Sequence, residues 1–512
     1  MTKHKYNFGA FLSKNSIIYI FIAFVVFGFA VGDFTASSFV NDIMARFFRN
    51  GLLVLALIIP IAAGLGLNFG MVVGALAGML SIIFVRYHYA LYVDWGFYSG
   101  HLFSGIGGII FCFIIATPIA LLFGWLTGLL FNRTRGQEMV AGLMVSFFAE
   151  GLYMIFVLFF IGGVIPVTMG HRMINPAPPG AERAFGIRGN FEMGLPAGEM
   201  TGRGAGGDIP GMARAINNLW SMEFVYTLAL LSLIAFLFLI IRRIYMKRNP
   251  GLFILHEPLW AFVVKLVACG AVLVFAFFSS AQIYYWYNVL QRTPEVAGRL
   301  DHLEGISAFA VEISRINQVP MVLGIIIAVV GLFMVYFFKT KLGQDCRSIG
   351  NSQQIGNVAG IDVDRTRIIA TIMSTVLAAW GMIIYLQDMG HVSTYTVQRN
   401  IGFFSVATIL VGGATVARAN VKNVMLGLIL FHGMSVVSPA VGIHFFDDAN
   451  AGEYMRTFMV YGVIGLSLGM YVWRGHKEAK AKERLDGEVV MSSGFNVPQD
   501  TPDPGSDGGS DE

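Results

Sequence analysis

Residues Lys339–Arg367 read KTKLGQDCRSIGNSQQIGNVAGIDVDRTR, and this polar, basic stretch lies between two apolar runs of membrane-spanning length. Gly350 and Gly360 punctuate it, and the residues between them can form about two to three helical turns. Asn351 or Ser352 can cap the start of such a helix, and Gly360 can end it. A helix this short is marginal alone in water, so it needs a surface to pack on, either the base of the bundle or a partner protein.

Composition places the chain in the membrane. Of its 512 residues, 56% are hydrophobic and only 13% are charged, and its mean hydropathy is +0.67. Soluble domains carry about 25% charged residues. The three cysteines, Cys112, Cys269 and Cys346, lie far apart and have neither metal-ligand nor redox spacing. We therefore expect a membrane protein without a metal site or a disulfide framework.

Apolar runs recur along the chain and predict an all-α, polytopic membrane helix bundle that occupies residues 17–473. We expect about 10–12 transmembrane helices, because a hydrocarbon core of about 30 Å needs about 20 apolar residues per helix. The predicted spans are Ile17–Gly32, Gly51–Leu67, Asn68–Val85, Phe103–Phe131, Met139–Val164, Phe224–Ile241, Leu259–Phe278, Val319–Phe338, Ile368–Leu386, Ile401–Val416, Val424–Ile443 and Thr457–Trp473. The second and third share one continuous run with Pro60 and six glycines, so the alternative is one broken element and a re-entrant piece.

Lysine and arginine in short loops set the orientation of a membrane protein. If the N-terminal residues 1–16 are cytoplasmic and the spans alternate, the cytoplasmic segments hold 21 of the chain's 35 lysines and arginines. Both termini are therefore predicted to be cytoplasmic, and residues 339–367 form a cytoplasmic segment between two spans.

Three segments outside the spans have distinct compositions. Residues 165–223 form a long extracytoplasmic loop rich in Gly, Pro and Arg, which is either a surface for a substrate-delivery protein or an insertion without a role. Residues 293–318 carry apolar side chains every three or four positions and predict an extracytoplasmic amphipathic helix. The tail at 474–512 ends in an acidic, Gly- and Pro-rich sequence and is predicted to be cytoplasmic and disordered.

The order of residues in Gly350–Val363, GNSQQIGNVAGIDV, resembles the cytoplasmic coupling segment of the ribose-type ABC importer permeases. That superfamily also includes nucleoside, riboflavin and branched-chain amino-acid permeases. The downstream run Ile401–Gly413, IGFFSVATILVGG, is similar to the family's apolar run that ends in Gly-Gly. The clear similarity covers about a hundred residues, from Leu342 to about Met434, and the helix layout supports the rest.

This resemblance implies the permease subunit of an ABC importer, whose cytoplasmic segment docks into a cleft of a separate ATPase subunit. Gln354 and Ile355 stand where the family has paired alanines. The ATPase-coupling residues that the resemblance implies are Gly350, Asn351, Gln354, Ile355, Gly360, Ile361 and Val363. The implied partners are an ABC ATPase, a second permease in a homodimer or heterodimer, an extracytoplasmic solute-binding protein or lipoprotein, and membrane lipid. Neither a nucleic-acid partner nor a cofactor is implied.

The sequence lacks the motifs of an ATP-hydrolysing enzyme. It contains no Gly-Lys dipeptide and hence no Walker A phosphate loop, and no catalytic triad or zinc motif occurs. We therefore expect that the chain is not an enzyme and that ATP hydrolysis occurs in a partner subunit.

Polar residues inside or beside the spans are candidates for the translocation path. Glu150 stands near the middle of a predicted span, where a carboxylate is costly unless it is paired, protonated or hydrated. Asn68 lies in the Gly-rich stretch GLGLNFGMVVGALAGML, and its alternative role is a structural hydrogen bond. The other candidates, from the polar connection between two spans, are Asp388, His391 and Gln398. The connection is either an entry lip or an ordinary solvated loop.

Scarce intramembrane charge favours a small neutral polar solute, such as a simple sugar or a nucleoside. One alternative from another class stays open, an ion-coupled secondary transporter that uses Glu150 as its proton or cation site. In that case transport would survive without an ATPase and collapse with the ion gradient.

Overall fold

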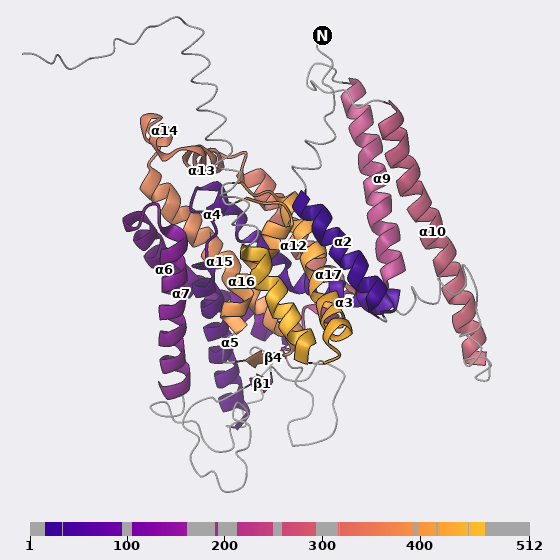
Figure 1. Ribbon diagram of the computed structural model, residues 1–512, viewed down its shortest axis with the longest axis horizontal. Coiled ribbons are helices and arrows are strands. Elements are labelled where there is room, and N and C mark those ends of the chain that lie inside the picture. Colours follow the sequence, from indigo (N-terminus) through magenta and orange to yellow (C-terminus); the bar gives the residue numbers. More distant parts are fainter. Residues whose placement is uncertain are drawn as a thin grey trace, which may run out of the picture. The chain divides into compact units, whose positions relative to one another are not determined.

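The computed structural model describes residues 16–32, 34–94, 105–160, 190–192, 212–248, 259–292, 316, 318–393, 397–415, 418–448 and 450–465, and these are mostly helical (Figure 1). In chain order the helices are α2 (Ser16–Val31), α3 (Ala36–Leu55), α4 (Ile58–Ala62), α5 (Met71–Asp94), α6 (Gly105–Arg133), α7 (Glu138–Met154), the π-helix η2 (Ile155–Phe160), the 3-10 turn η3 (Asn217–Leu219), α9 (Phe224–Arg248), α10 (Leu259–Arg292), α12 (Met321–Phe337), α13 (Lys341–Asn351), α14 (Gln353–Val358), α15 (Val363–Met389), α16 (Val397–Val411), α17 (Val421–Phe446) and a last helix at residues 450–465.

The predicted polytopic helix bundle is confirmed. Within the described ranges, seven helices are long and apolar enough to cross a membrane, or eight if the bent pair α12–α13 is one span. In α2, α5 and α16 the apolar segments found among the described residues are shorter, Ile18–Val31, Met71–Val85 and Val397–Val411. The second half of the predicted span Thr457–Trp473 lies outside the described residues.

The centre of the bundle is built on α15, which packs against α3, α5 and α6. Glycines on α5 and α6 face α15 so closely that a Cβ would meet its backbone: Gly74 and Gly78 lie against the carbonyls of Thr375 and Ala379, and Gly124 lies against the Cα of Ile372. Small residues allow such approach between membrane helices, where van der Waals packing replaces the hydrophobic effect. These three helices therefore interlock through their backbones.

A second packing group joins α2, α16, α17 and the helix at residues 450–465. Its buried core contains Phe21, Phe431, Met434 and Val460, which come from three of these helices. Large side chains fill the space between these helices. Close backbone approach occurs here too, because a Cβ at Gly427 of α17 would overlap the Thr408 carbonyl oxygen of α16.

The second predicted span, Gly51–Leu67, is wrong at its start. Helix α3 begins at Ala36, where Thr35 caps it by accepting a hydrogen bond from the Ser38 N–H, and α3 and α4 together form one candidate span, Ala36–Ala62. The charged residues in the first part of α3 hid this helix from a search for apolar runs. Arg46 donates to the Ser435 hydroxyl of α17 at 3.0 Å, so its charge lies against a neighbouring helix.

The predicted span Asn68–Val85 also begins differently, because residues 63–70 are irregular and α5 starts at Met71. The Asn68 side chain reaches Ser374, which is eleven residues beyond the start of α15 and therefore about 16 Å along that helix. Non-helical backbone at membrane depth is tolerated only where protein buries it or where it lines a water-filled cavity. Residues 65–70 are buried, so this segment meets that condition.

Two short strand pairs connect the segments predicted to be extracytoplasmic. Strand β1 (Asn190–Glu192) pairs antiparallel with β4 (His391–Ser393), and β2 (Ser221–Met222) pairs with β3 (Val319–Pro320). Described parts of the long 165–223 loop thus contact segments that the alternating topology puts on the same side. Nearly all of the predicted 293–318 helix, most of the loop, and the whole 474–512 tail lie outside the described residues.

Candidate functional site

The predicted coupling segment 339–367 contains two consecutive helices, α13 and α14, followed by the first turns of α15. The prediction placed one short helix between Gly350 and Gly360, and α14 confirms it, whereas α13 was missed. Thr340 caps α13 by accepting from the Gly343 N–H at 3.3 Å, and Cys346 and Ile349 form its buried face. This amphipathic pattern lies in a polar stretch too short to stand out beside the membrane spans.

Gly360 ends α14 as predicted. Its φ of +73° lies in the left-handed region, which glycine adopts without strain. The Ile361 N–H donates to the Gly356 carbonyl and the Gly360 N–H to the Asn357 carbonyl, which is the hydrogen-bond pattern of a Schellman ending. At the other end, Ser352 is extended and its carbonyl accepts from the Gly356 N–H, so Ser352 begins α14 while Asn351 is the last residue of α13.

Gly350 holds the coupling helices onto the base of the bundle. A Cβ at this position would overlap the carbonyl oxygen of Ala62, and a Cβ at Gly64 would lie 3.0 Å from the Gly350 Cα. The end of α13 therefore rests directly on the backbone that follows α4. Because backbone atoms cannot rotate away as side chains can, a displacement of α13 is transmitted to this turn.

Helix α14 packs inward through a small residue and exposes its other face. A Cβ at Gly356 would lie 3.2 Å from Cγ1 of Ile349 and 3.7 Å from Cγ2 of Val363. Gln354 is exposed, and Val358 is 90% exposed although it is apolar. The Ile355 side chain lies outside the described residues. The tip of α14 thus presents an apolar side chain that the bundle does not cover.

Behind the coupling helices, the start of α15 is tied to the turn between α6 and α7. Arg367 is completely buried, pairs with Glu138, and donates to the Phe131 carbonyl at 3.3 Å. On the surface, Arg135 pairs with Asp364, whose carbonyl accepts from the Asn132 amide at 3.0 Å. Arg367 was counted among the basic residues of a cytoplasmic loop, whereas in the structure it is a buried residue of α15.

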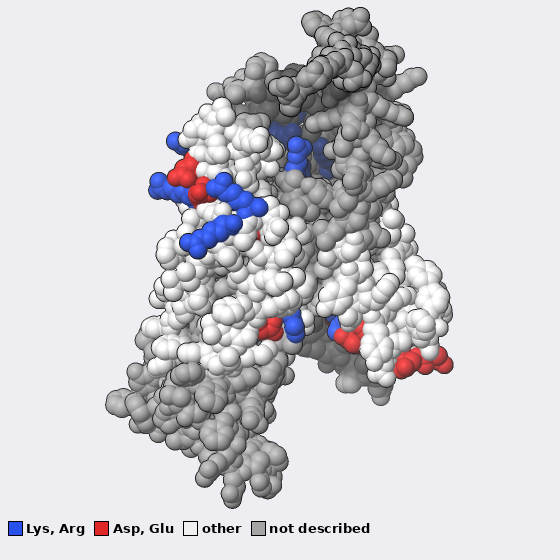
Figure 2. All heavy atoms as spheres, turned by 60° about the vertical axis from the view of Figure 1, so that its left-hand side comes forward, with Lys and Arg blue, Asp and Glu red and all other residues white. Residues whose placement is uncertain are grey.

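Basic side chains gather at the end of the bundle that carries α14 and the α6–α7 turn (Figure 2). Arg133, Arg135, Arg347 and Arg365 are exposed there. Such a positive end is typical of the cytoplasmic side of a membrane protein.

Asn68, the first path candidate, is buried in the irregular segment 63–70. Its amide donates to the Ser374 hydroxyl at 3.3 Å, while its carbonyl oxygen has no hydrogen-bond partner among the described residues. Beside it, the Ser146 hydroxyl of α7 donates to the Phe69 carbonyl at 2.7 Å. The predicted structural hydrogen bond of Asn68 is therefore present.

Glu150 lies one turn farther along α7 and faces α16. Its Oε2 is 3.8 Å from Nε of Arg399, and its Oε1 has no partner within the described part of the chain. Gln398, next to Arg399, is fully buried, and neither polar atom of its amide has a partner there. Glu150 and Arg399 thus form an ion pair between α7 and α16, whereas the amide of Gln398 stays unsatisfied.

Asp388 belongs to a separate network at the last turn of α15, and His391 lies just beyond that turn without joining the network. Asp388 accepts from Nε of Arg49 and from the Asn217 amide, both at 2.6 Å, and Gln387 donates to the Asn217 carbonyl oxygen at 2.8 Å. His391 contacts only the Met389 carbonyl through Nδ1 among the interactions described. No direct contact described here joins this network to Glu150 or Asn68, so the candidates occupy three levels along the bundle.

Several members of these networks were missed by sequence reasoning, namely Arg49, Glu138, Asn217, Ser374 and Arg399. Each of these residues lies either beside a predicted loop or inside a predicted helix, and no sequence motif marks it. The useful signal is a charge within a helix of this low-charge chain, because such a residue must find a partner.

Comparisons with known proteins show which proteins the chain is similar to. The chain is 31% identical over 96 residues to the nucleoside ABC transporter permease protein NupB of Lactococcus lactis subsp. cremoris, which is 18% of this chain and 26% of the relative. It is 28% identical over 157 residues to the nucleoside ABC transporter permease protein NupC of that organism, 30% of this chain and 44% of the relative. The matches thus span less than half the length of either relative. No solved structure matches the chain.

A family model described as "Branched-chain amino acid transport system / permease component" matches residues 212–468, which is half of the chain. The match confirms the superfamily that residues 350–363 and 401–413 indicated. Together with the membrane-spanning helices, it makes the chain a multi-pass protein of the inner membrane. The chain belongs to the family of branched-chain amino acid transport system permease components.

Proposed function

We propose that this chain is the permease subunit of an ABC importer and that α13 and α14 couple it to a separate ATPase subunit. One observation carries the proposal: α14 presents the exposed Val358 at its tip while Gly350 fixes the preceding helix to the backbone after Ala62. A partner that covers Val358 and moves α14 would therefore move the base of the bundle. Coupling residues Asn351 and Gln354 are exposed on the same two helices, and Ile361 and Val363 connect them to α15.

The motion would reach the membrane spans through two connections. The first runs from Gly350 to Gly64 and on to the irregular segment that holds Asn68. The second runs from Val363 to Arg367, whose ion pair with Glu138 joins α15 to α7. Both connections end at path candidates, because α7 also carries Glu150. Closure of the ATPase on nucleotide binding would thus change the contact between α7 and α16, which includes the Glu150–Arg399 ion pair.

The solute that fits this path is small, neutral and polar, with a nucleoside as the first choice and a simple sugar as the second. The support is chemical: among the uncharged path candidates, the amide of Gln398 and the side-chain carbonyl oxygen of Asn68 have no hydrogen-bond partner in the described residues. An amide offers both a donor and an acceptor, which suits a base edge or a sugar hydroxyl. The nucleoside permeases named above favour the first choice.

The structure also bears on the alternative of ion-coupled transport. Glu150 has a cation beside it, the Arg399 guanidinium, so it does not need a transported proton or metal cation to compensate its charge. This arrangement favours a structural or gating role for Glu150. Further partners under this proposal are a second permease subunit and an extracytoplasmic solute-binding protein, which would dock on the side where β1 and β4 pair.

The proposal is tested by purifying the tagged chain from its natural membrane in mild detergent and identifying what copurifies. An ABC ATPase is expected, and the complex in vesicles should take up radiolabelled adenosine, uridine or ribose only when ATP is supplied. Glu150→Gln should leave the ATP requirement unchanged. Uptake by the chain alone, driven by an ion gradient and abolished in Glu150→Gln, would establish the alternative.

A further inference from the structure

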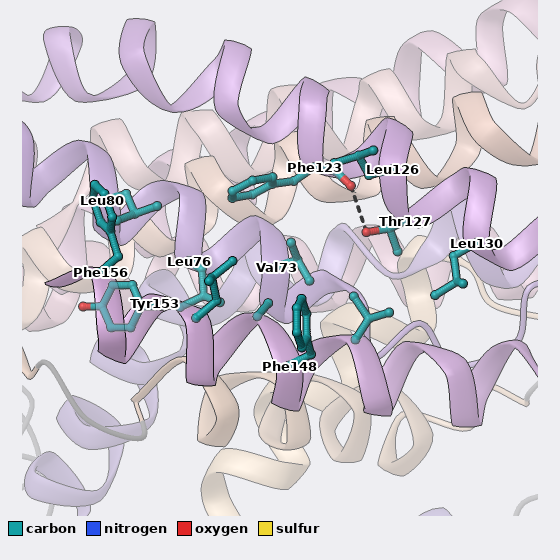
Figure 3. Close-up of a pocket in the computed structure, with 13 residues that line it drawn as sticks. Val73, Leu76, Leu80, Phe123, Leu126, Thr127, Leu130, Phe148, Tyr153 and Phe156 are labelled. Carbon is teal, nitrogen blue, oxygen red and sulfur yellow. Dashed lines mark hydrogen bonds between the residues drawn. The ribbon is translucent and has the colours of Figure 1, made fainter. Parts of the chain in front are cut away.

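An apolar cavity of about 540 Å³ lies between α5, α6 and the α7–η2 helix (Figure 3). Ligand sites have volumes of about 300–1,000 Å³, so this cavity is large enough to hold a ligand. Its floor is buried and includes Val73, Leu76 and Tyr153, whereas its rim includes Leu152 and Phe148, the latter 73% exposed. The cavity therefore opens on the outside of the bundle.

The cavity follows from the way α5 and α6 pack. Both helices turn their glycines toward α15, with Gly78 against Ala379 and Gly128 against Ile368. Their large side chains, Leu76 and Leu80 of α5 and Phe123 of α6, are then left on other faces, where α7 covers them without filling the space. The gap is a consequence of this close backbone packing, which holds α5 and α6 against α15.

The chemistry of the walls selects the occupant. Thr127 uses its hydroxyl within its own helix, donating to the Phe123 carbonyl at 2.8 Å. The other polar group in the walls is the Tyr153 hydroxyl, which has no hydrogen-bond partner among the described residues although the side chain is buried. Water does not occupy apolar cavities of this kind, because it needs two to four polar partners. The surrounding solvent in these spans is the hydrocarbon of lipid.

The dimensions match one lipid leaflet. The wall residues of α7 and η2 run from Val145 to Phe156, a separation of eleven positions or about 16 Å of helix. Half of a hydrocarbon core of about 30 Å is about 15 Å. In Figure 3, Leu130 lies at one end of the cavity and Leu80, Tyr153 and Phe156 at the other, with the tyrosine oxygen directed away from Leu130. The polar group is therefore at the end of α7 that the topology places on the outer side.

We propose that this cavity is a binding site for one acyl chain of an outer-leaflet phospholipid, with the Tyr153 hydroxyl donating to an ester oxygen of the same lipid. Buried tyrosine hydroxyls normally have a partner, and an ester carbonyl at the top of an acyl chain supplies an acceptor at this position. Val73, Leu76 and Leu152 contact the chain along its length. The site needs neither nucleotide nor the ATPase, so its test is independent of the transport proposal.

The test uses the full chain in phosphatidylethanolamine vesicles that contain a phosphatidylglycerol with a photoreactive diazirine in its acyl chain. After illumination, the adducts are mapped by mass spectrometry. We expect them to concentrate on the walls of the cavity, above all on α7 between Val145 and Phe156, and to be several-fold rarer on the exposed faces of α9 and α10. An even distribution of adducts over all lipid-facing helices would overturn the proposal.

Two variants on α7 separate the site from general lipid contact. Ala149→Phe fills the cavity and should reduce adducts in its walls about tenfold. Gly151→Phe adds the same ring where no atom lies within 4 Å, and it should label as the natural chain does. Equal labelling of the natural chain and Ala149→Phe would contradict the proposal.

Tyr153→Phe keeps the shape of the cavity and removes only the hydroxyl, so it also covers the case in which Ala149→Phe fails to fold. It should reduce labelling by the diazirine phospholipid several-fold and leave labelling by a diazirine alkane, which has no ester, unchanged. If the two probes respond equally to Tyr153→Phe, the assigned hydrogen bond does not exist.

Discussion

The inner and the outer end of the bundle are held by different kinds of contact. At the inner end, α13 rests on the backbone after α4 through Gly350, and Arg367 is buried against Glu138. At the outer end, Asp388, Arg49 and Asn217 form a chain of side-chain hydrogen bonds that joins α15 to a segment of the long loop. Backbone contacts transmit a displacement, whereas partly exposed hydrogen bonds can exchange with water. We infer from this difference that the end at α13 moves rigidly with the ATPase, whereas the hydrogen bonds at the Asp388 end can break during transport.

The largest expected effect is at the inner end, in Arg367→Met. The substitution leaves Glu138 buried without its cation, and breaking one partner of a buried pair costs about 3–5 kcal/mol. We expect a large drop in the thermal unfolding temperature of the purified chain and loss of uptake. Arg365→Met removes an exposed charge two residues away and is the control. If both variants unfold alike, the buried pair does not hold the inner end.

Gly350→Ala tests the backbone contact itself. The added methyl group overlaps the Ala62 carbonyl, and overpacking of this kind costs about 1–3 kcal/mol. We expect stimulated ATP hydrolysis of the complex to continue while uptake falls, because the base of α13 is displaced. Gly136→Ala, in an exposed turn with no atom within 4 Å, controls for the loss of a glycine, although its φ of +85° adds local strain. Normal uptake in Gly350→Ala would show that the contact is not needed for coupling.

Asp388→Asn weakens the outer end with a smaller cost. The amide can still accept from Asn217 but no longer carries the charge that faces Arg49, a loss of about 1 kcal/mol. If the hydrogen bonds of Asp388 break during transport, the variant complex should hydrolyse ATP faster without solute while its unfolding temperature changes little. Unchanged basal hydrolysis together with reduced stability would assign the network a purely structural role.

Val358→Asp should leave stability unchanged within about 0.5 kcal/mol, because the side chain is 90% exposed. It places a charge on the apolar tip of α14, and we expect the ATPase to dissociate during purification. Val358→Met keeps the tip apolar and should retain the partner. A stable complex with Val358→Asp would place the docking surface elsewhere.

The substitution with the smallest expected effect tests on which side of the membrane α14 lies. Burial, and then the Asp345 carboxylate, raise the pKa of the Cys346 thiol to about 12, so it stays protonated and unreactive at neutral pH. A cysteine introduced as Val358→Cys, with Cys269 replaced by serine, should react with a membrane-impermeant maleimide only when the reagent reaches the cytoplasmic face. Labelling from outside intact cells would reverse the predicted orientation.

The sequence predicted those elements whose signal is local. Helix α14 and its ending at Gly360 follow from two glycines and a capping residue, and most spans follow from uninterrupted apolar runs. The start of α3 could not be found in this way, because its first turns carry Asp42, Arg46 and Arg49. Arg46 and Arg49 bond to residues more than 300 positions away, Ser435 and Asp388. Such partners depend on the packed fold, which no window of sequence contains.

In the candidate site, too, residues with a local sequence signal were predicted, and partners that depend on the packed fold were not. The coupling residues were predicted because they occur in order within fourteen positions, Gly350–Val363. Among the path candidates, Glu150 was identified by the cost of a charge in a span, but its partner Arg399 was not. Asn68 was placed at the start of a predicted span, with a broken element as the alternative, and its partner Ser374 depends on the packed fold.

The glycine contacts that join α5, α6 and α15 also limit how the transporter can change its shape. Rotating one of these helices against another would drive a carbonyl, such as that of Thr375, into the neighbouring main chain. The trio must therefore travel as a single block throughout the transport cycle. Hinges belong at its borders with α7 and α16, where side chains can exchange rotamers. Distance measurements between spin labels should find α5–α15 separations constant in every nucleotide state, with the changes confined to pairs that cross those borders.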